Sequence, residues 1–165
     1  KCIGVDINPE YVEKARENDI EAYTMEADNL EFPDNTFDTV LLFEILEHVD
    51  NPHKILKESK RVAKKNILIT VPNCTQFFEL KSTGLTYEHI LEKDHINFFT
   101  KKDLENLISK EFSTFRVAED DPINLNQLSL ITGLPLWLRL LISLFNKLKF
   151  IKSSLYYRLY AVIDV

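Results

Sequence analysis

Short apolar runs alternate with helical patterns over the first half of the sequence, and this alternation limits the possible folds more than any other feature. The apolar runs that predict strands are 2–5, 21–25, 37–43 and 66–71. Helices are expected to begin at Asn8-Pro9, between the first two runs, and at Asn51-Pro52, between the last two. Strands that are separated by helices pair in parallel through right-handed crossovers, and the helices cover both faces of the sheet. The sequence therefore predicts an open α/β sheet in which 37–43 (FDTVLLF) is a buried strand.

The second half of the sequence is less regular. The expected elements are a helix over 100–109, a strand over 112–117, an apolar helix over 134–150 and a strand over 156–165. Thr100 and Asp103 have the spacing of a capping box at the start of the first of these helices. No repeat and no low-complexity linker divides the chain, so a single domain over residues 1–165 is predicted.

Composition and charge exclude several classes of protein. The chain has 20 basic and 26 acidic residues, and a net charge of −6 repels a phosphate backbone, so we expect no nucleic-acid partner. Two cysteines are too few for a disulfide framework or a zinc module, which favours a reducing, cytoplasmic location. The three glycines lie far apart, so no glycine-rich phosphate loop can exist among these residues. No apolar run reaches the roughly 20 residues of a membrane-spanning helix.

Five segments carry a resemblance to a known family through their order and spacing. They are VDINPEYVEKAR from Val5, ADNLEFPDNTFDTVLLFEILEHV from Ala27, NP at 51–52, NILITVPN from Asn66 and HINFFTKKDLENLI from His95. Together they resemble class I S-adenosylmethionine-dependent methyltransferases, in particular the small-molecule branch related to ubiquinone-pathway O-methyltransferases. The resemblance implies S-adenosylmethionine as cofactor and a Rossmann-like, mostly parallel sheet with an antiparallel C-terminal strand. It also implies that 74–100 and 120–155 are insertions or a lid on the acceptor side.

The resemblance also indicates what this sequence lacks. In that family a first strand and a glycine-rich loop precede the position that matches Val5-Asp6, and here both are absent. Residue 1 is Lys and the only methionine is Met25, so we expect the start of the gene product to be missing and the sheet to be truncated at its N-terminus. Between Val5 and Leu41 we expect a gap of two strand spacings, ~10 Å, and weak cofactor binding by the chain as given.

Cofactor contacts are implied by the resemblance at six positions, namely Asp6, Ile7, Asp28, Asn29, Leu30 and Phe43. Asp6 would accept both ribose hydroxyl hydrogens, a role that suits an acidic side chain at the end of a strand. Ile7 would pack on the adenine, Asp28 would accept from its amino group, and the two residues after Asp28 would present backbone to the ring. Phe43 would lie near the methionine part. On the residues alone, Asp6 can equally be a helix cap, Asp28 a turn residue and Phe43 a core residue.

A group of acidic and histidine residues follows directly after Phe43. A helical turn there would place Glu44 and Glu47 at i and i+3, with both carboxylates on one side and His48 beside them. Some ubiquinone-pathway enzymes and small-RNA 2′-O-methyltransferases have a Glu-x-x-Glu-His pattern and a later histidine that together hold a divalent ion. The resemblance therefore implies a metal site formed by Glu44, Glu47, His48 and His95. His48 and Glu44 are the expected catalytic residues, although a helix dipole alone also favours acids at a helix start.

The charge changes sign along the chain. Residues 134–165 hold five basic residues and one acidic residue, a net charge of +4, whereas residues 1–133 have a net charge of −10. The stretch 134–152 combines leucines, Trp137 and lysines in the way that interfacial helices do, which predicts peripheral contact with a membrane. The alternative is a helix that covers the substrate face of its own domain.

These features favour an enzyme that transfers the methyl group of S-adenosylmethionine to an oxygen, ahead of a nitrogen or carbon, of a small or lipid-linked acceptor. Two alternatives stay open at this point. A nicotinamide-dependent Rossmann oxidoreductase is one, since an acid after an early strand suits the ribose of either cofactor. A non-catalytic module that associates with membranes is the other.

Overall fold

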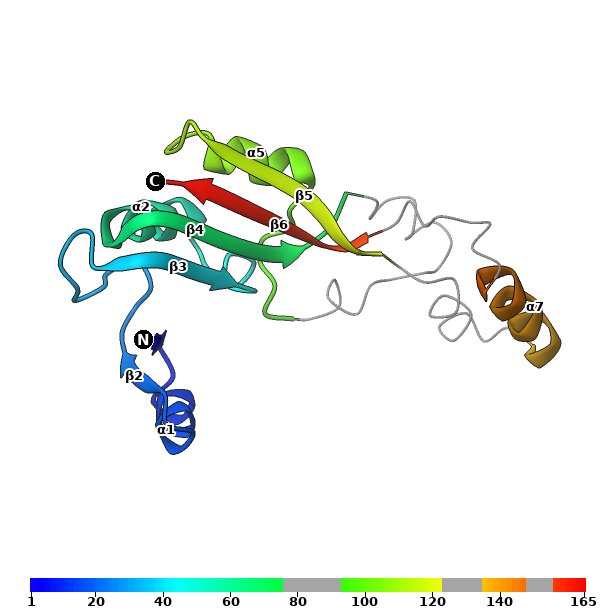
Figure 1. Cartoon of the computed structure of the whole chain (residues 1–165), viewed down its shortest axis with the longest axis horizontal. Coiled ribbons are helices and arrows are strands. Elements are labelled where there is room, and N and C mark those ends of the chain that lie inside the picture. The colour runs from blue at the N-terminus through cyan, green and yellow to red at the C-terminus, as the bar shows by residue number, and fades with distance from the viewer. Residues whose placement is uncertain (76–92, 123–134, 148–155) are drawn as a thin grey trace.

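The computed structural model describes residues 1–75, 93–122, 135–147 and 156–165, and within them six strands form two sheets (Figure 1). The strands are β1 (Ile3–Asp6), β2 (Glu21–Thr24), β3 (Phe37–Phe43), β4 (Ala63–Pro72), β5 (Phe115–Pro122) and β6 (Tyr156–Asp164). The larger sheet has the order β3-β4-β6-β5, and the smaller sheet pairs β1 with β2. Both β1-β2 and β3-β4 are parallel pairs, whereas β6 is antiparallel to β4 and β5. The predicted α/β class, with an open sheet and an antiparallel C-terminal strand, is confirmed.

The helices of the described residues are α1 (Pro9–Glu17), α2 (Pro52–Val62), α5 (Lys101–Ile108) and α7 (Leu136–Lys147). Asn8 and Asn51 cap α1 and α2, and each side chain accepts a hydrogen bond from an amide of the first turn. A proline follows each of these caps, at a position where no amide hydrogen is needed. The predicted capping box between Thr100 and Asp103 starts α5. The starts of α1, α2 and α5 were therefore correctly predicted from capping residues.

The main core lies between one face of the larger sheet and the helices α2 and α5. Alternate residues of β4 point into this core, and Ile67, Ile69 and Val71 are buried there. Leu56 of α2 and Leu104 of α5 pack against the same cluster. Burial of such a side chain is worth about 1.5–3 kcal/mol relative to exposure. This face of the sheet is therefore the main source of hydrophobic stabilisation in the described residues.

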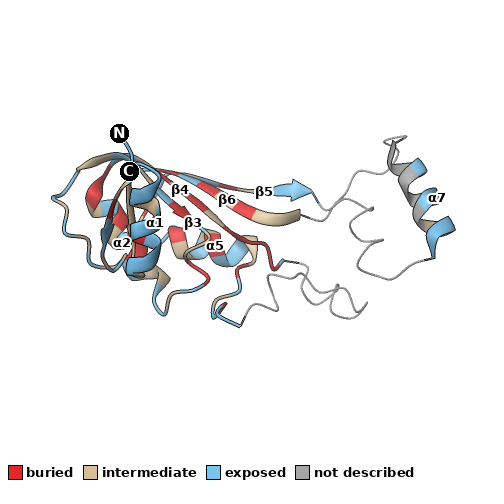
Figure 2. Ribbon diagram, turned by 90° about the horizontal axis from the view of Figure 1, so that it is seen from below, coloured by how far each residue is buried: buried red, intermediate tan, exposed pale blue. Residues whose placement is uncertain are grey.

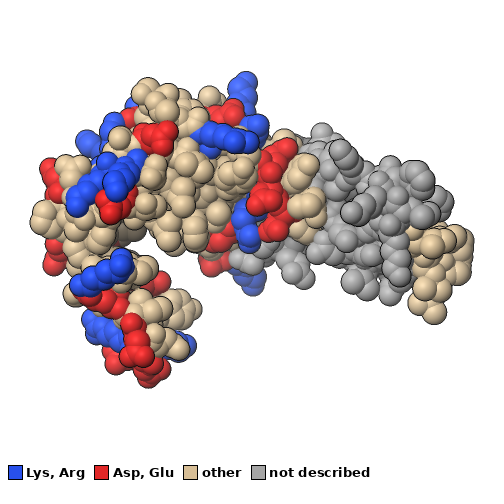
Figure 3. Space-filling model, in the orientation of Figure 1, with Lys and Arg blue, Asp and Glu red and all other residues tan. Residues whose placement is uncertain are grey.

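The opposite face of the larger sheet is not covered by a helix of the described residues. Leu41 and Phe43 of β3 point to this face and are 51% and 50% exposed, and Val162 of β6 is exposed on the same face, across β4 from Leu41. Figure 3, in the orientation of Figure 1, shows an uncharged band here between charged side chains. For the described residues, the predictions of helices on both faces and of a buried β3 are therefore wrong. The reason is that α2 and α5 both pack on the other face, and that β3 is an edge strand with a described neighbour on one side only.

The elements β1, α1 and β2 form a small unit that is set apart from the larger sheet (Figure 1). Val12 and Ala22 are its buried apolar side chains, and neither belongs to the main core. β1 and β3 lie in different sheets of the described residues, and the strand expected between them stays a prediction. The spacing of ~10 Å between them stays a prediction.

The helix α7 lies at the end of the molecule toward which β3 and β4 run (Figure 1). Several of its side chains are exposed, as Figure 2 shows by colour. Among the described residues, no helix has both the length and the apolar character that crossing a bilayer requires. Most of the predicted insertions, 74–100 and 120–155, lies outside the described residues, so the insertions and the single domain stay predictions.

Candidate functional site

The turn after β3 carries the first residues of the predicted site. Glu44 has a φ of 54°, a left-handed conformation that is uncommon for residues other than glycine. Its amide donates to the carbonyl of Thr70 in β4, at 3.0 Å. The His48 amide donates to the Ile45 carbonyl, which closes a turn and does not continue a helix. The predicted helical turn is therefore wrong, and the left-handed backbone at Glu44 is the reason that its carboxylate does not align with that of Glu47.

The segment that contains His95 is tied to this turn by hydrogen bonds of Asn97. The Asn97 backbone amide donates to the Glu47 carbonyl at 3.0 Å. Its side-chain amide donates to the carbonyls of Leu46 and Val49, at 3.0 and 2.7 Å. Carbonyl groups that are withdrawn from water need such partners. Asn97 therefore holds two segments together that lie about 50 positions apart in the chain.

Glu47, His48 and His95 converge where these two segments meet. One ligand atom from each side chain lies within 4.8 Å of the other two. The two imidazole rings meet edge to face, with ring centroids 4.6 Å apart. Glu47 and His95 are 1% and 8% exposed, whereas His48 reaches the surface. The structure thus brings together three of the four residues that the resemblance implied as metal ligands, and Glu44 is not one of them.

The orientation of His48 determines what its imidazole can do. His48 Nδ1 lies 3.2 Å from the carbonyl oxygen of Asp94 and 3.5 Å from the Asp94 carboxylate. Because a carbonyl oxygen only accepts, Nδ1 carries a hydrogen, and in the neutral imidazole Nε2 then has the lone pair. Such an imidazole can accept a proton, or it can bind a divalent ion, since metal-bound histidines commonly donate their other N–H to a carbonyl. One carboxylate and two imidazoles also form a donor set that suits zinc, iron or manganese.

Glu44 belongs instead to a charged network at the carboxyl end of the larger sheet. Its Oε1 lies 3.1 Å from Arg158 Nε, and Arg158 Nη1 lies 2.8 Å from Asp121 Oδ2. Arg158 is on β6, between β4 and β5 in the sheet, so its guanidinium links the end of β3 to the end of β5. Asp121 also has a positive φ, 57°. Both acids that hold Arg158 therefore have left-handed backbone, a feature that is common at functional sites.

The cofactor residues predicted at the ends of β1 and β3 lie in the two separate sheets. The Asp6 carboxylate accepts a hydrogen bond from the Asn8 amide at 2.8 Å, so it is fixed at the start of α1. Ile7 and Phe43 are both exposed. They offer apolar surface at the carboxyl ends of β1 and β3, where α/β proteins bind their ligands.

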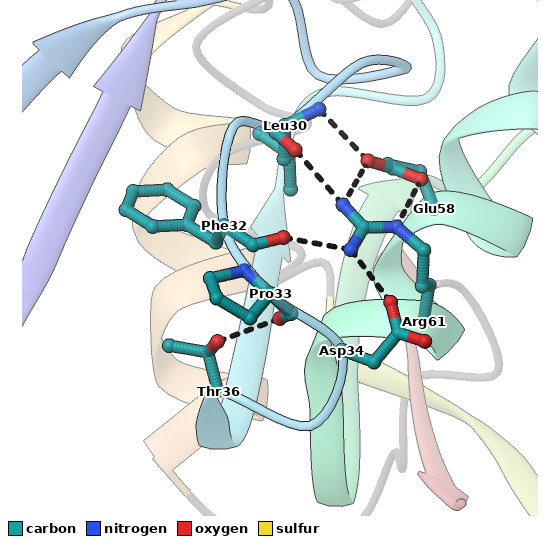
Figure 4. Close-up of polar contacts among 7 residues, drawn as sticks. All are labelled: Leu30, Phe32, Pro33, Asp34, Thr36, Glu58 and Arg61. Atoms are coloured by element: carbon teal, nitrogen blue, oxygen red, sulfur yellow. Dashed lines mark hydrogen bonds and ion pairs between the residues drawn. The ribbon is translucent and has the colours of Figure 1, made fainter.

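The other predicted cofactor residues lie on the loop between β2 and β3, which is bound to α2 (Figure 4). Arg61 of α2 donates to the carbonyls of Leu30 and Phe32 and to the carboxylates of Asp34 and Glu58. The Leu30 amide donates to Glu58 Oε1 at 2.8 Å. Both backbone groups of Leu30 are therefore hydrogen-bonded within the protein, and the predicted contact of its backbone with an adenine ring stays a prediction.

The Arg61–Glu58 pair is the electrostatic anchor of this loop. The guanidinium holds the pKa of the Glu58 carboxyl below its ordinary value, and the Leu30 amide lowers it further. The hydrogen bonds to Glu58 and Asp34 raise the pKa of Arg61. Asp28 lies nearby, 3.9 Å from the Lys54 ammonium, and lines a surface groove of 390 Å³ together with basic residues of α2. The loop is thus held in one arrangement by ionised groups.

Three residues that organise the site were missed by the sequence reasoning, namely Arg61, Asn97 and Arg158. Arg158 had a visible signal, since it is a charged residue within an otherwise apolar alternating strand. Asn97 lies in a segment that carries the family resemblance, next to the predicted ligand His95. Arg61 had no comparable signal, because a basic residue in the last turn of a helix is common for reasons of helix dipole alone.

Comparison with known proteins identifies similar sequences and structures. Residues 1–70 match the family model of a methyltransferase domain. An uncharacterized protein of Methanocaldococcus jannaschii is 30% identical over 114 residues, which cover 66% of this chain and 53% of that protein. The chain therefore spans about half the length of this relative.

Solved structures show the same fold at low sequence identity. A Thermotoga maritima S-adenosylmethionine-dependent methyltransferase, described as a possible histamine N-methyltransferase, is 21% identical with a TM-score of 0.67, over 98% of this chain and 72% of that one. A methyltransferase of the same cofactor dependence from Archaeoglobus fulgidus is 19% identical with a TM-score of 0.65, over 99% and 75%. Residues 1–70 thus resemble a methyltransferase domain, and the described residues share the fold of these S-adenosylmethionine-dependent methyltransferases.

Proposed function

We propose that the protein transfers the methyl group of S-adenosylmethionine to an oxygen of a small or lipid-linked acceptor. The observation that carries this proposal is the cluster that Glu47 and His48, in the turn after β3, form with His95. The carboxyl ends of parallel strands are where open α/β sheets bind ligands. A group that can remove a proton from an acceptor hydroxyl is therefore present where an acceptor would be expected.

The chain's residues fit a nucleoside cofactor in part. Asp6 supplies a fixed carboxylate for ribose hydroxyls, and Ile7 and Phe43 supply exposed apolar surface for the flat base and the methionine part. S-Adenosylmethionine, when bound, supplies an electrophilic methyl group. The protein's task is then to align the acceptor oxygen with that group and to take its proton.

His48 is the candidate for proton removal. Its Nδ1 hydrogen is directed to the Asp94 carbonyl, so its Nε2 can accept a proton from an acceptor hydroxyl. Arg158 is a candidate positioning residue, because it fixes Glu44 beside the same turn. The oxygen preference is supported by the resemblance to O-methyltransferases and by the presence of a base.

Glu47, His48 and His95 would also hold a divalent ion, and this forms part of the proposal. The donor set fits, since the three ligand atoms lie within 4.8 Å of one another, and ligands at about 2.0–2.2 Å from one tetrahedral ion lie about 3.4 Å apart. Such an ion would lower the pKa of an acceptor hydroxyl. Metal analysis of the purified protein and of His95→Ala tests this without an activity measurement: equal metal content in both would contradict it.

Cofactor binding is tested by calorimetric titration with S-adenosylhomocysteine. We expect strong binding by a form extended upstream of residue 1, weak binding by the chain as given, and a loss of about tenfold or more in Asp6→Asn of the extended form. Asn keeps an oxygen for the Asn8 amide, so the start of α1 is preserved. Asp38→Asn, an exposed acid on β3, is the matched control and should bind like the parent. Failure of the extended form to bind would overturn the proposal.

The acceptor class is tested by release of S-adenosylhomocysteine with a set of phenols and a matching set of amines. Turnover of phenols that falls about 100-fold or more in His48→Gln, with unchanged affinity for S-adenosylhomocysteine, is expected for a base. Turnover of amines alone would contradict an oxygen acceptor.

The two alternatives are less well supported. The nicotinamide-dependent oxidoreductase is not favoured, because the matched family is a methyltransferase domain. A non-catalytic module would not need the buried carboxylate and imidazole beside an exposed base.

A further inference from the structure

The helix α7 exposes a continuous apolar face. Five of its residues are between 42% and 72% exposed, and they are Leu136, Trp137, Leu140, Leu141 and Leu144. Their spacing of one, three and four positions places all five within about 140° of the helix circumference at 100° per residue. Figure 3 shows the described surface of α7 as uncharged. A face of this kind is costly in water and indicates an apolar partner.

The sequence around this face is basic. Residues 134–155 contain four basic residues, Arg139, Lys147, Lys149 and Lys152, and no Asp or Glu. Residues 1–133 have a net charge of −10, so the basic stretch is an exception within an acidic protein. Apolar bulk with tryptophan, next to cations alone, is the combination that binds the interface of an anionic bilayer.

We propose that α7 binds the surface of an anionic lipid bilayer, with its five exposed apolar residues in the interface. The helix has 12 residues, too few to cross the hydrocarbon core, and Trp137 suits the headgroup boundary. α7 lies beyond the carboxyl ends of β3 and β4, on the side toward which these strands run (Figure 1). Membrane contact through α7 would therefore turn that side of the molecule toward the bilayer. This inference does not depend on methyl transfer.

The chain offers a specific probe, because Trp137 is its only tryptophan. We expect the tryptophan emission to shift to shorter wavelength when vesicles of phosphatidylcholine and phosphatidylserine are added, and the protein to sediment with them. Vesicles of phosphatidylcholine alone should bind much more weakly, and raised salt should release the protein from the mixed vesicles. No shift and no sedimentation with the mixed vesicles would overturn the proposal.

The charge contribution is tested by Lys147→Glu, Lys149→Glu and Lys152→Glu together. Each basic residue near an anionic surface contributes about fivefold in affinity, so the triple variant should bind at least about 100-fold more weakly. Lys14→Glu, Lys57→Glu and Lys102→Glu together change the net charge by the same amount at exposed positions elsewhere, and form the matched control. Equal loss in both triple variants would show repulsion by net charge and would contradict a site at α7.

The apolar contribution is tested by Leu140→Ser with Leu144→Ser, which should abolish sedimentation, whereas Tyr11→Ser, at an exposed residue of α1, should not. Far-ultraviolet circular dichroism of each variant checks that the sheet is intact. Two results would assign the face to another partner and overturn the proposal. One is a stable dimer in light scattering that Leu140→Ser dissociates, and the other is a Trp137 emission that is already at short wavelength without lipid and unchanged by it.

Discussion

The larger sheet and the small β1-α1-β2 unit are built from the same kind of strand and helix, but they differ in what they bury. The larger sheet packs α2 and α5 on one face and buries long side chains such as Leu56 and Ile69. Among the described residues, the small unit buries only Val12 and Ala22 as apolar side chains. Local sequence therefore determines the elements, whereas burial depends on the strands that lie beside them.

The edges of the two sheets explain this difference. In the described residues, β1 pairs only with β2 and β3 pairs only with β4. A two-stranded unit has too little surface to cover its own apolar residues, and isolated pairs are marginally stable in water. The exposed Leu41 and Phe43 on β3 reflect the same condition on the larger sheet. We expect the two regions to respond to substitution as separate units.

The largest effect is expected at Leu56, which has no exposed surface in the main core. Leu56→Ala should lower the free energy of unfolding by about 2–5 kcal/mol, through lost burial and the cavity that remains. Leu41→Ala, the same substitution at an exposed position of the larger sheet, is the matched control and should change it by less than about 0.5 kcal/mol. Urea denaturation followed by circular dichroism measures both. Similar losses in the two variants would mean that Leu41 is covered in solution.

Val12→Ala tests whether the small unit unfolds separately from the larger sheet. Because Val12 is buried only within the small unit, we expect faster amide exchange in α1 and β2 and almost no change in the unfolding midpoint of the larger sheet. A shift of the whole transition would show that the two regions unfold as one.

The next largest difference is expected in the reactivity of the two cysteines, since Cys2 belongs to the small unit and Cys74 follows β4 of the larger sheet. Burial raises the pKa of the Cys74 thiol to about 11. At pH 8 its thiolate fraction is then at least about 100-fold below that of an ordinary thiol with a pKa of about 8.5. Cys2 is exposed. We expect iodoacetamide to label Cys2 readily and Cys74 only after denaturation, as peptide mass analysis would show. Rapid labelling of Cys74 in the native protein would contradict its burial.

Much of the fold could be predicted from the sequence, because capping residues and apolar periodicity are local signals. Asn8, Asn51 and Thr100 marked helix starts that the structure has. The exposure of β3 could not be predicted in the same way, since its seven residues read as a core strand when a neighbour is assumed on each side. Lateral neighbours are a property of the sheet and leave no trace within the strand.

The site was predicted in part for a similar reason. The grouping of Glu47, His48 and His95 followed from family spacing, and the structure brings these residues together. Glu44 was misplaced, because a single left-handed residue after β3 redirects its side chain to Arg158. A positive φ at a glutamate has no sequence signature, and Arg158 lies more than 100 positions away.

Arg61 connects the small unit to the larger sheet, since it binds the loop between β2 and β3 to α2. Its substitution therefore tests this connection. Arg61→Met keeps much of the apolar stem but removes the hydrogen bonds to Leu30, Phe32, Asp34 and Glu58. We expect faster amide exchange at Leu30 and a loss of stability smaller than that of Leu56→Ala. Arg116→Met, an arginine of β5 far from this loop in the sheet order, is the control. Unchanged exchange at Leu30 would mean that Glu58 alone holds the loop.

The smallest effect is expected in the pH dependence of the stabilisation that the Arg61–Glu58 pair provides. Because the pKa of Glu58 is lowered in the folded protein, chiefly by Arg61, the folded state binds this proton more weakly than the unfolded state. The stabilisation by Glu58 is therefore complete above the unfolded pKa of a glutamate, about 4.3, and is lost as the pH falls from there through the lower folded pKa. Glu58→Gln removes this titration, so the difference in unfolding free energy between parent and variant should shrink as the pH is lowered from 7 to 3. Glu10→Gln, on the exposed first turn of α1, should show no such convergence. A difference that stays constant across this range would mean that Glu58 contributes through packing, and the loop would then be held by shape and not by charge.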